Sequence, residues 1–276
     1  MNSFGKRVVF NISRLFPALV VRYAYAQLSN PQVSKLREHE LEVLDQAQKN
    51  TFPFMGFDIC TYHWPGEGQA ILLIHGWEGQ AGNFADLVLR LRKSGYAIYA
   101  FDGPSHGFSS KGKASLFEFT KLVGVLIEKF QVKKLVSHSF GGVATTYALY
   151  NNQSLHIDRY VLLTTPDRFT ERIDQVANVV GIAPVAVKML TSKIEKEYDI
   201  KANELNVSDF VQKINVNRSL IIHDENDRII PLEQSRRVAE NWQQCTLEEV
   251  TDTGHFRILR TESVLDRVLE FLNEDS

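Results

Sequence analysis

The sequence predicts an α/β fold built on an open, mostly parallel central sheet with helices on both faces. From residue 70 onward, short apolar runs of strand length alternate with longer stretches in which apolar residues recur at helical spacing. Strands that alternate with helices imply right-handed crossovers and a mostly parallel sheet. The chain has 276 residues, of which 44% are hydrophobic and 23% charged, so it can bury a substantial core and is neither disordered nor fibrous.

The first fifty residues predict a helical extension in front of this fold. Residues 8–22 place apolar side chains at helical spacing beside several cations, and Arg14 and Pro17 interrupt the run. We therefore expect neither a secretory signal nor a transmembrane helix. A basic amphipathic helix of this kind can lie on an anionic membrane surface, but we favour packing against the domain or a second subunit. A second helix is expected at 32–50, opened by Pro31.

The body of the chain divides into alternating elements. Residues 58–64 predict an edge strand, and a turn follows at 65–68. Further strands are expected at residues 70–74, 97–101, 135–137, 160–164, 220–223 and 246–250. The helices that alternate with them are expected at residues 84–93, 116–130, 142–151, 232–242 and 264–273.

One segment contains only helical patterns, at 168–180 and 185–196, and it predicts a helical cap inserted at about 165–217. The expected division is thus a helical extension over residues 1–50 and one α/β domain over 51–276 that carries the cap.

The net charge and the cysteine content indicate which kinds of binding partner and which cellular compartment to expect. Lysine and arginine number 31 against 33 aspartates and glutamates, which gives a net charge of −2 and predicts no nucleic-acid partner. The two cysteines, Cys60 and Cys245, form neither a disulfide framework nor a metal cluster. We interpret them as reduced thiols and expect a cytoplasmic protein.

The sequence Ser-His-Ser-Phe-Gly-Gly at residues 137–142 lies between a predicted strand and a predicted helix. It matches the pattern of a nucleophile elbow, in which the nucleophile is flanked two positions away on either side by a small residue. Ser139 stands at the centre of this pattern. Ser137 stands where glycine is more usual. The same residues could instead form a serine N-cap in a glycine-rich turn.

An acyl-transfer site also needs two backbone donors for its oxyanion. The amide of Phe140, directly after the nucleophile, would supply one donor. The second is expected from the loop His75-Gly76-Trp77, which follows the strand at 70–74, and the Trp77 amide is our choice. The alternative is a plain turn at the end of a strand, in which His75 only satisfies neighbouring backbone groups.

Two further strand ends carry a candidate acid and a candidate base. Asp227 lies in the loop after the strand at 220–223, and Asp224 is the alternative because it is nearer the strand end. His255 follows the last strand within Thr253-Gly254-His255-Phe256. A histidine base needs a carboxylate to fix its tautomer, and Ser139, Asp227 and His255 occur in the order found in this kind of site.

With these motifs, residues 51–276 resemble the α/β-hydrolase fold superfamily. The resemblance rests on His75-Gly76, on Asp-Gly-Pro-Ser-His-Gly-Phe-Ser at 102–109, on the elbow, on Asp227 with Pro231, and on Gly254-His255. It implies a serine hydrolase with a Ser139, His255 and Asp227 triad and a lid formed by the insertion. In such proteins Asp102 and His106 usually hold a loop together. Asp224 stands where many relatives have glycine, and the minimal fold lacks a helical extension.

The expected function is hydrolysis of a small or medium carboxylic ester through an acyl-enzyme intermediate, without a metal or organic cofactor. A thioesterase, a carbon–carbon bond hydrolase or a non-catalytic ligand-binding protein would be compatible with the same residues.

A homo-oligomer and a membrane contact through residues 1–30 stay open. The cap holds apolar residues that could line a substrate pocket or pack the cap onto the body: Val179, Val180, Ile182, Val185, Val187, Met189 and Leu190.

Overall fold

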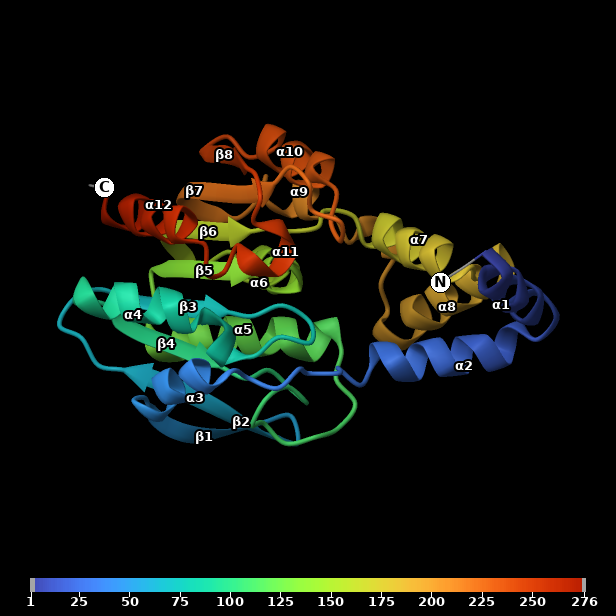
Figure 1. Ribbon diagram of the computed structural model, residues 1–276, viewed down its shortest axis with the longest axis horizontal. Coiled ribbons are helices and arrows are strands. Elements are labelled where there is room, and N and C mark those ends of the chain that lie inside the picture. The colour runs from blue at the N-terminus through green and yellow to red at the C-terminus, as the bar shows by residue number, and fades with distance from the viewer. Residues whose placement is uncertain (1–2, 275–276) are drawn as a thin grey trace. The chain divides into compact units, whose positions relative to one another are not determined.

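An eight-stranded sheet forms the centre of the computed structural model, which describes residues 3–274 (Figure 1). Its strand order is β1-β2-β4-β3-β5-β6-β7-β8, and every neighbouring pair from β4 to β8 is parallel. The strands are β1 Gln48–Phe54, β2 Phe57–Trp64, β3 Ala70–Ile74, β4 Ala97–Phe101, β5 Lys134–His138, β6 His156–Leu163, β7 Asn215–Asp224 and β8 Cys245–Val250. The predicted α/β class and mostly parallel sheet are confirmed.

Helices cover both faces of this sheet, because its central strands bury side chains on both sides. Three helices share one apolar cluster with the sheet: α3 Glu38–Asp45, α4 Ala85–Lys93 and α12 Glu262–Asn273. Three more pack on the opposite face: α5 Leu116–Phe130, α6 Phe140–Asn151 and α10 Leu232–Glu240. The short helices of this part are η1 Ala81–Phe84, α9 Val207–Phe210 and α11 Gly254–Arg257. Adjacent residues Ile71 and Leu72 of β3 are both fully buried, as expected for a strand covered on two faces.

The amino-terminal edge of the sheet differs from the prediction. The strand predicted at 58–64 is not an edge strand, because β1 pairs antiparallel on one side of β2 and β4 pairs antiparallel on the other. β1 occupies residues that were expected to end a helix at 32–50; only α3 within that range is helical. β1 shows no clear alternation, since its side chains are mostly exposed, and the turn Met55-Gly56 with positive φ at both residues closes the hairpin.

A separate compact unit contains residues up to Asn30 together with Arg168–Asn206. Its helices are α1 Ser3–Leu15, α2 Pro17–Leu28, α7 Phe169–Val180, α8 Pro184–Tyr198 and η2 Ala202–Glu204. Val21 of α2 packs with Ala186, Leu190 and Ile194 of α8 in its apolar core. The single helix expected at 8–22 is therefore two helices, divided at Phe16 with Pro17 opening the second.

The predicted cap helices at 168–180 and 185–196 correspond to α7 and α8. The structure groups them with α1 and α2, whereas the sequence divided the chain at residue 50; that domain division stays a prediction. Of the apolar cap residues, Ile182 and Leu190 pack into the helical unit, while Val179, Val180, Val185 and Met189 are exposed. Within residues 3–274, every helix falls short of the length and apolar character needed to cross a bilayer.

Candidate active site

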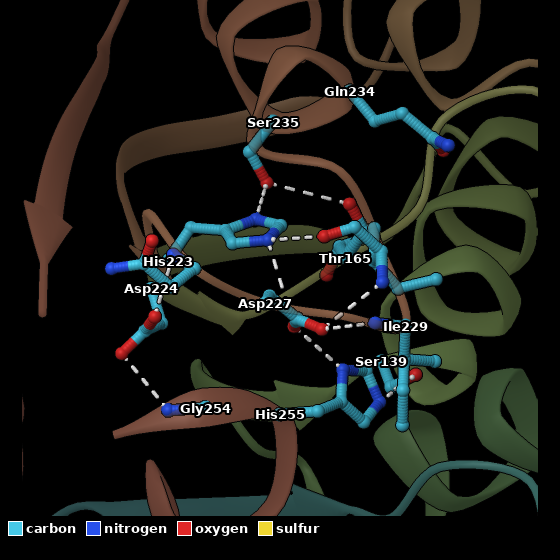
Figure 2. A network of polar contacts seen from close by, with 12 residues as sticks. Ser139, Thr165, His223, Asp224, Asp227, Ile229, Gln234, Ser235, Gly254 and His255 are labelled. Atoms are coloured by element: carbon cyan, nitrogen blue, oxygen red, sulfur yellow. Dashed lines mark hydrogen bonds and ion pairs between the residues drawn. The ribbon is translucent and has the colours of Figure 1, made fainter. Parts of the chain in front are cut away.

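The four sequence-predicted strand ends meet at the carboxyl edge of the sheet. His75 follows β3, Ser139 follows β5, Asp227 follows β7, and His255 lies in α11 after β8. Since β3, β5, β6, β7 and β8 are consecutive parallel neighbours, their carboxyl ends lie on one edge. Side chains separated by more than a hundred residues in the sequence are thereby brought into one network (Figure 2).

Ser139 occupies a strained turn between β5 and α6. Its φ of 52° and ψ of −123° lie in a region that residues other than glycine rarely adopt. The turn is held by the Ser139 N–H, which donates to the carbonyl of Leu163, and by the Gly142 N–H, which donates to the carbonyl of Ser139. The side chain is only half-buried, so its hydroxyl stands at the amino end of α6 where a reactant can approach it.

The elbow needs small residues because atoms of neighbouring segments lie very close to its backbone. A Cβ atom on Gly141 would lie 2.5 Å from the carbonyl oxygen of His75, and one on Gly142 would lie 2.3 Å from Oγ1 of Thr165. Ser137 is accommodated where glycine is usual because its Oγ lies 2.9 Å from the hydroxyl of Tyr160, so neither buried group lacks a partner.

Gly141→Ala should destabilise the protein, because the added methyl would overlap the backbone carbonyls of both Ile74 and His75. We expect a loss of about 1–3 kcal/mol in the free energy of unfolding. Gly124→Ala is the matched control: it lies in α5, and the nearest atom to its added Cβ is 3.9 Å away. It should leave stability unchanged or raise it by up to about 1 kcal/mol. Equal denaturant midpoints for both variants would contradict this account of the elbow.

Ser139, His255 and Asp227 form a continuous hydrogen-bonded chain. His255 Nε2 lies 3.0 Å from Ser139 Oγ, and His255 Nδ1 lies 2.8 Å from Asp227 Oδ2 (Figure 2). A carboxylate only accepts hydrogen bonds, so Nδ1 carries the proton of the neutral imidazole and Nε2 accepts from the serine hydroxyl. In this geometry a histidine can act as a general base toward a hydroxyl group.

The environment of Asp227 keeps this carboxylate ionised. Burial by itself would raise the pKa of Asp227, but hydrogen bonds from His255 and from the backbone N–H groups of Ile229 and Ile230 outweigh it and hold the pKa below its usual value. An ionised carboxylate fixes the ring of His255 and stabilises the imidazolium that forms when the ring accepts a proton.

Asp224, the alternative acid, has a different set of partners. Its Oδ2 accepts from the backbone N–H groups of Thr253 and Gly254 and from the Thr253 hydroxyl, while its Oδ1 accepts from the N–H of Asn226. Asp224 therefore ties the end of β7 to the loop that carries His255. The contact to the imidazole itself is made by Asp227.

Two buried histidines, which were not assigned a role from the sequence, contact His255 and Asp227. His138 Nε2 donates to the backbone carbonyl of His255 over 2.8 Å, and burial lowers the pKa of His138 to about 3. His223 Nε2 donates to the carbonyl of Ile230 and lies 3.7 Å from Asp227 Oδ2. Burial also lowers the pKa of His223. No spacing rule identifies such contacts, because each depends on where a loop passes in space.

The loop that carries Trp77 and the start of α6 at Phe140 lie beside Ser139. A Cβ atom on Gly76 would lie 3.2 Å from Ser139 Cβ, so the loop after β3 passes directly next to the elbow, and the rings of Trp77 and Phe140 are 5.1 Å apart. Within the described residues, neither the Trp77 N–H nor the Phe140 N–H donates to a protein acceptor. Backbone N–H groups without a protein acceptor are the kind of donor that can stabilise an oxyanion.

The other polar residues near this edge hold loops in place. His75 Nδ1 donates to the carbonyl of Gly76, and its Nε2 accepts from the N–H of Gly103, which joins the loops after β3 and β4. Asp102 accepts from Ala81 N–H, Phe108 N–H and the Tyr62 hydroxyl. His106 Nδ1 donates to the carbonyl of Pro104. These contacts match the loop-holding role that the resemblance implied for Asp102 and His106.

The arrangement of potential metal ligands can be stated for residues 3–274. This part of the chain has no group of three or more His, Cys, Asp or Glu side chains placed to hold an ion.

The amino-acid sequence of this chain is similar to those of known hydrolases. A family described as "alpha/beta hydrolase fold" matches residues 69–180, the region from β3 through the elbow to α7. The "Uncharacterized hydrolase YugF" of Bacillus subtilis (strain 168) is 23% identical in an alignment that covers 80% of this chain and 96% of that protein.

Two solved structures illustrate the likeness in three dimensions. The esterase EaEST from Exiguobacterium antarcticum has a TM-score of 0.66 and 17% identity, over 82% of this chain and 100% of that one. The Pyrococcus furiosus esterase Pf2001 has a TM-score of 0.65 and 17% identity, over 89% of this chain and 97% of that one. At these identities the likeness shows a common fold.

Proposed function

Since this chain is a hydrolase of the α/β-hydrolase superfamily, we propose that it cleaves a small or medium carboxylic ester with Ser139 as nucleophile. The proposal rests above all on the unbroken chain of hydrogen bonds from Ser139 through His255 to Asp227. A serine is a weak nucleophile by itself and needs an adjacent base that a third group orients. The names of the two similar esterases favour an ester over other acyl compounds.

In the first half-reaction, His255 Nε2 takes the proton of Ser139 as Oγ attacks the carbonyl carbon of the ester. The negative charge that develops on the carbonyl oxygen is stabilised by the N–H groups of Trp77 and Phe140, and the imidazolium is stabilised by Asp227. The bond to the leaving alkoxide then breaks, and His255 returns the proton to that oxygen. The products are an alcohol and an acyl-Ser139 ester.

In the second half-reaction, His255 removes a proton from water, which attacks the acyl-Ser139 carbonyl. The tetrahedral intermediate collapses with the proton returned to Ser139 Oγ, and the carboxylic acid is released. No redox step or group transfer to another carrier is needed. The same residues would open a thioester or a carbon–carbon bond in a diketone, so the leaving group has to be determined by experiment.

A panel of p-nitrophenyl esters of rising acyl length, with matched thioesters, tests this proposal. We expect the wild-type protein to hydrolyse short or medium esters faster than the matched thioesters. Faster turnover of the thioesters would instead favour a thioesterase. Absence of turnover across both series, by a protein shown to be folded, would point to a non-catalytic ligand-binding protein on the same scaffold.

A further inference from the structure

The helical unit presents an unusual surface in which apolar side chains face outward. On α1, Phe4, Val8, Ile12 and Leu15 recur every three or four residues, so they form one stripe along the helix. All four are exposed, and Phe4 and Leu15 retain 74% and 70% of their accessible surface. Single exposed apolar residues need no explanation, but a continuous stripe marks an interaction surface.

The side of α1 that packs inside the unit is formed by smaller groups. Ser13 is fully buried, and its hydroxyl accepts from the N–H of Ala183. A Cβ atom on Gly181 would lie 2.7 Å from the carbonyl oxygen of Lys6, so the backbone of α1 approaches this turn closely. α1 is thus anchored to the cap helices by its polar and small face, which leaves its apolar face outward.

The next helix continues the pattern. Leu19 and Tyr23 of α2 are 65% and 68% exposed, and Phe16 precedes them at the start of the helix. The opposite side of α2, with Val21, packs against α8. We call the exposed set the apolar-basic surface; it comprises Phe4, Val8, Ile12, Leu15, Phe16, Leu19 and Tyr23 with the exposed cations Arg7, Arg14 and Arg22.

Charge distinguishes between the occupants that could cover this surface. Residues 1–30 contain four lysines and arginines and no acidic residue, and in the described part of the chain none of the four forms an ion pair. The helical unit as a whole carries 10 basic against 6 acidic residues, a net charge of +4, whereas the remainder carries 21 against 27, a net of −6. Two copies of this chain that met symmetrically through the surface would oppose arginine to arginine.

We infer that the apolar-basic surface binds the face of an anionic phospholipid bilayer. The exposed leucine, phenylalanine and isoleucine side chains would enter the boundary between headgroups and acyl chains, while the arginines that border the stripe would remain at the phosphate level. Cations near such a surface each add attraction to anionic lipid, and apolar burial adds to it. This inference does not depend on the proposed ester hydrolysis.

Co-sedimentation of the full chain with vesicles tests the inference. The wild-type protein should sediment with vesicles of phosphatidylcholine and phosphatidylglycerol, less with phosphatidylcholine alone, and less at high salt. Leu15→Gln with Leu19→Gln should weaken binding at least about tenfold, because two exposed leucines lose their burial in lipid. Arg7→Gln with Arg14→Gln should weaken binding to the anionic vesicles by about tenfold or more.

The matched control is Leu89→Gln with Lys93→Gln on α4, which changes the same kinds of exposed side chain outside the helical unit. It should bind vesicles like the wild type. Failure of the wild type to sediment, or equal binding by the Leu15/Leu19 variant, would overturn the inference. So would light scattering that shows a wild-type dimer turned into monomers by that variant, because the surface would then join two copies. Thermal unfolding followed by circular dichroism reports the folding of each variant without reference to ester hydrolysis, so the two proposals fail independently.

Discussion

Replacement of Ser139 by alanine should abolish ester hydrolysis while leaving the protein folded. The Ser139 hydroxyl lies 3.0 Å from His255 Nε2, which is the contact a serine nucleophile needs with its base. Removal of the nucleophile in a comparable site lowers turnover by about 10⁶-fold, and we expect a loss of at least about 10⁴-fold here. The free energy of unfolding should change by less than about 1 kcal/mol, since the side chain is only half-buried.

Ser137→Ala provides the matched control, because Ser137 lies two residues earlier in the same elbow. Its hydroxyl contacts Tyr160 and not His255, so the variant should lose about 1 kcal/mol of stability and retain turnover within about tenfold. A fluorophosphonate probe should label the wild type and Ser137→Ala but not Ser139→Ala. Turnover by Ser139→Ala at the wild-type rate, or persistent labelling of that variant, would refute the nucleophile.

The second large effect concerns the acid of the triad. Asp227→Asn should reduce kcat by about 10⁴-fold, because an amide no longer fixes the Nδ1–H tautomer of His255 or stabilises the imidazolium. The backbone N–H groups of Ile229 and Ile230 can still donate to the amide oxygen, so the loop should keep its shape.

Asp224→Asn separates this role from loop stability. Asp224 accepts four hydrogen bonds, one from Asn226 just after β7 and three from residues 253–254, and an asparagine with one acceptor oxygen in place of two cannot accept all of them. We expect a loss of about 1–3 kcal/mol in stability and a much smaller fall in kcat than for Asp227→Asn. Steady-state kinetics below the unfolding temperature, together with thermal unfolding, measure both. The reverse order of kcat losses would identify Asp224 as the acid.

The sequence could not show which of these two aspartates contacts His255. Asp224 is the last residue of β7 and Asp227 lies three residues further along, and both have a side chain suited to orient a histidine. Which of them meets the imidazole depends on the path of the loop after β8, where Thr253 and Gly254 use one carboxylate and His255 uses the other. The same holds for His138, whose partner is the carbonyl oxygen of a residue 117 positions further along the chain. His223 contacts the nearer carbonyl of Ile230, and its approach to Asp227 depends on how the loop after β7 folds back.

The α/β class, the alternation of strands and helices, and the strand ends that carry Ser139, Asp227 and His255 could all be predicted from the amino-acid sequence. This was possible because burial on both faces imposes continuous apolar strands, and because parallel strands place their carboxyl ends on one edge. The position of β1 at the edge of the sheet could be seen only in the folded structure. Its side chains are mostly exposed, so its sequence lacks the alternation of apolar and polar residues that would predict a strand. The packing of α2 against α8 was likewise visible only in the folded structure. These helices lie some 160 residues apart, and contacts of that kind depend on how their surfaces fit and not on any local sequence pattern.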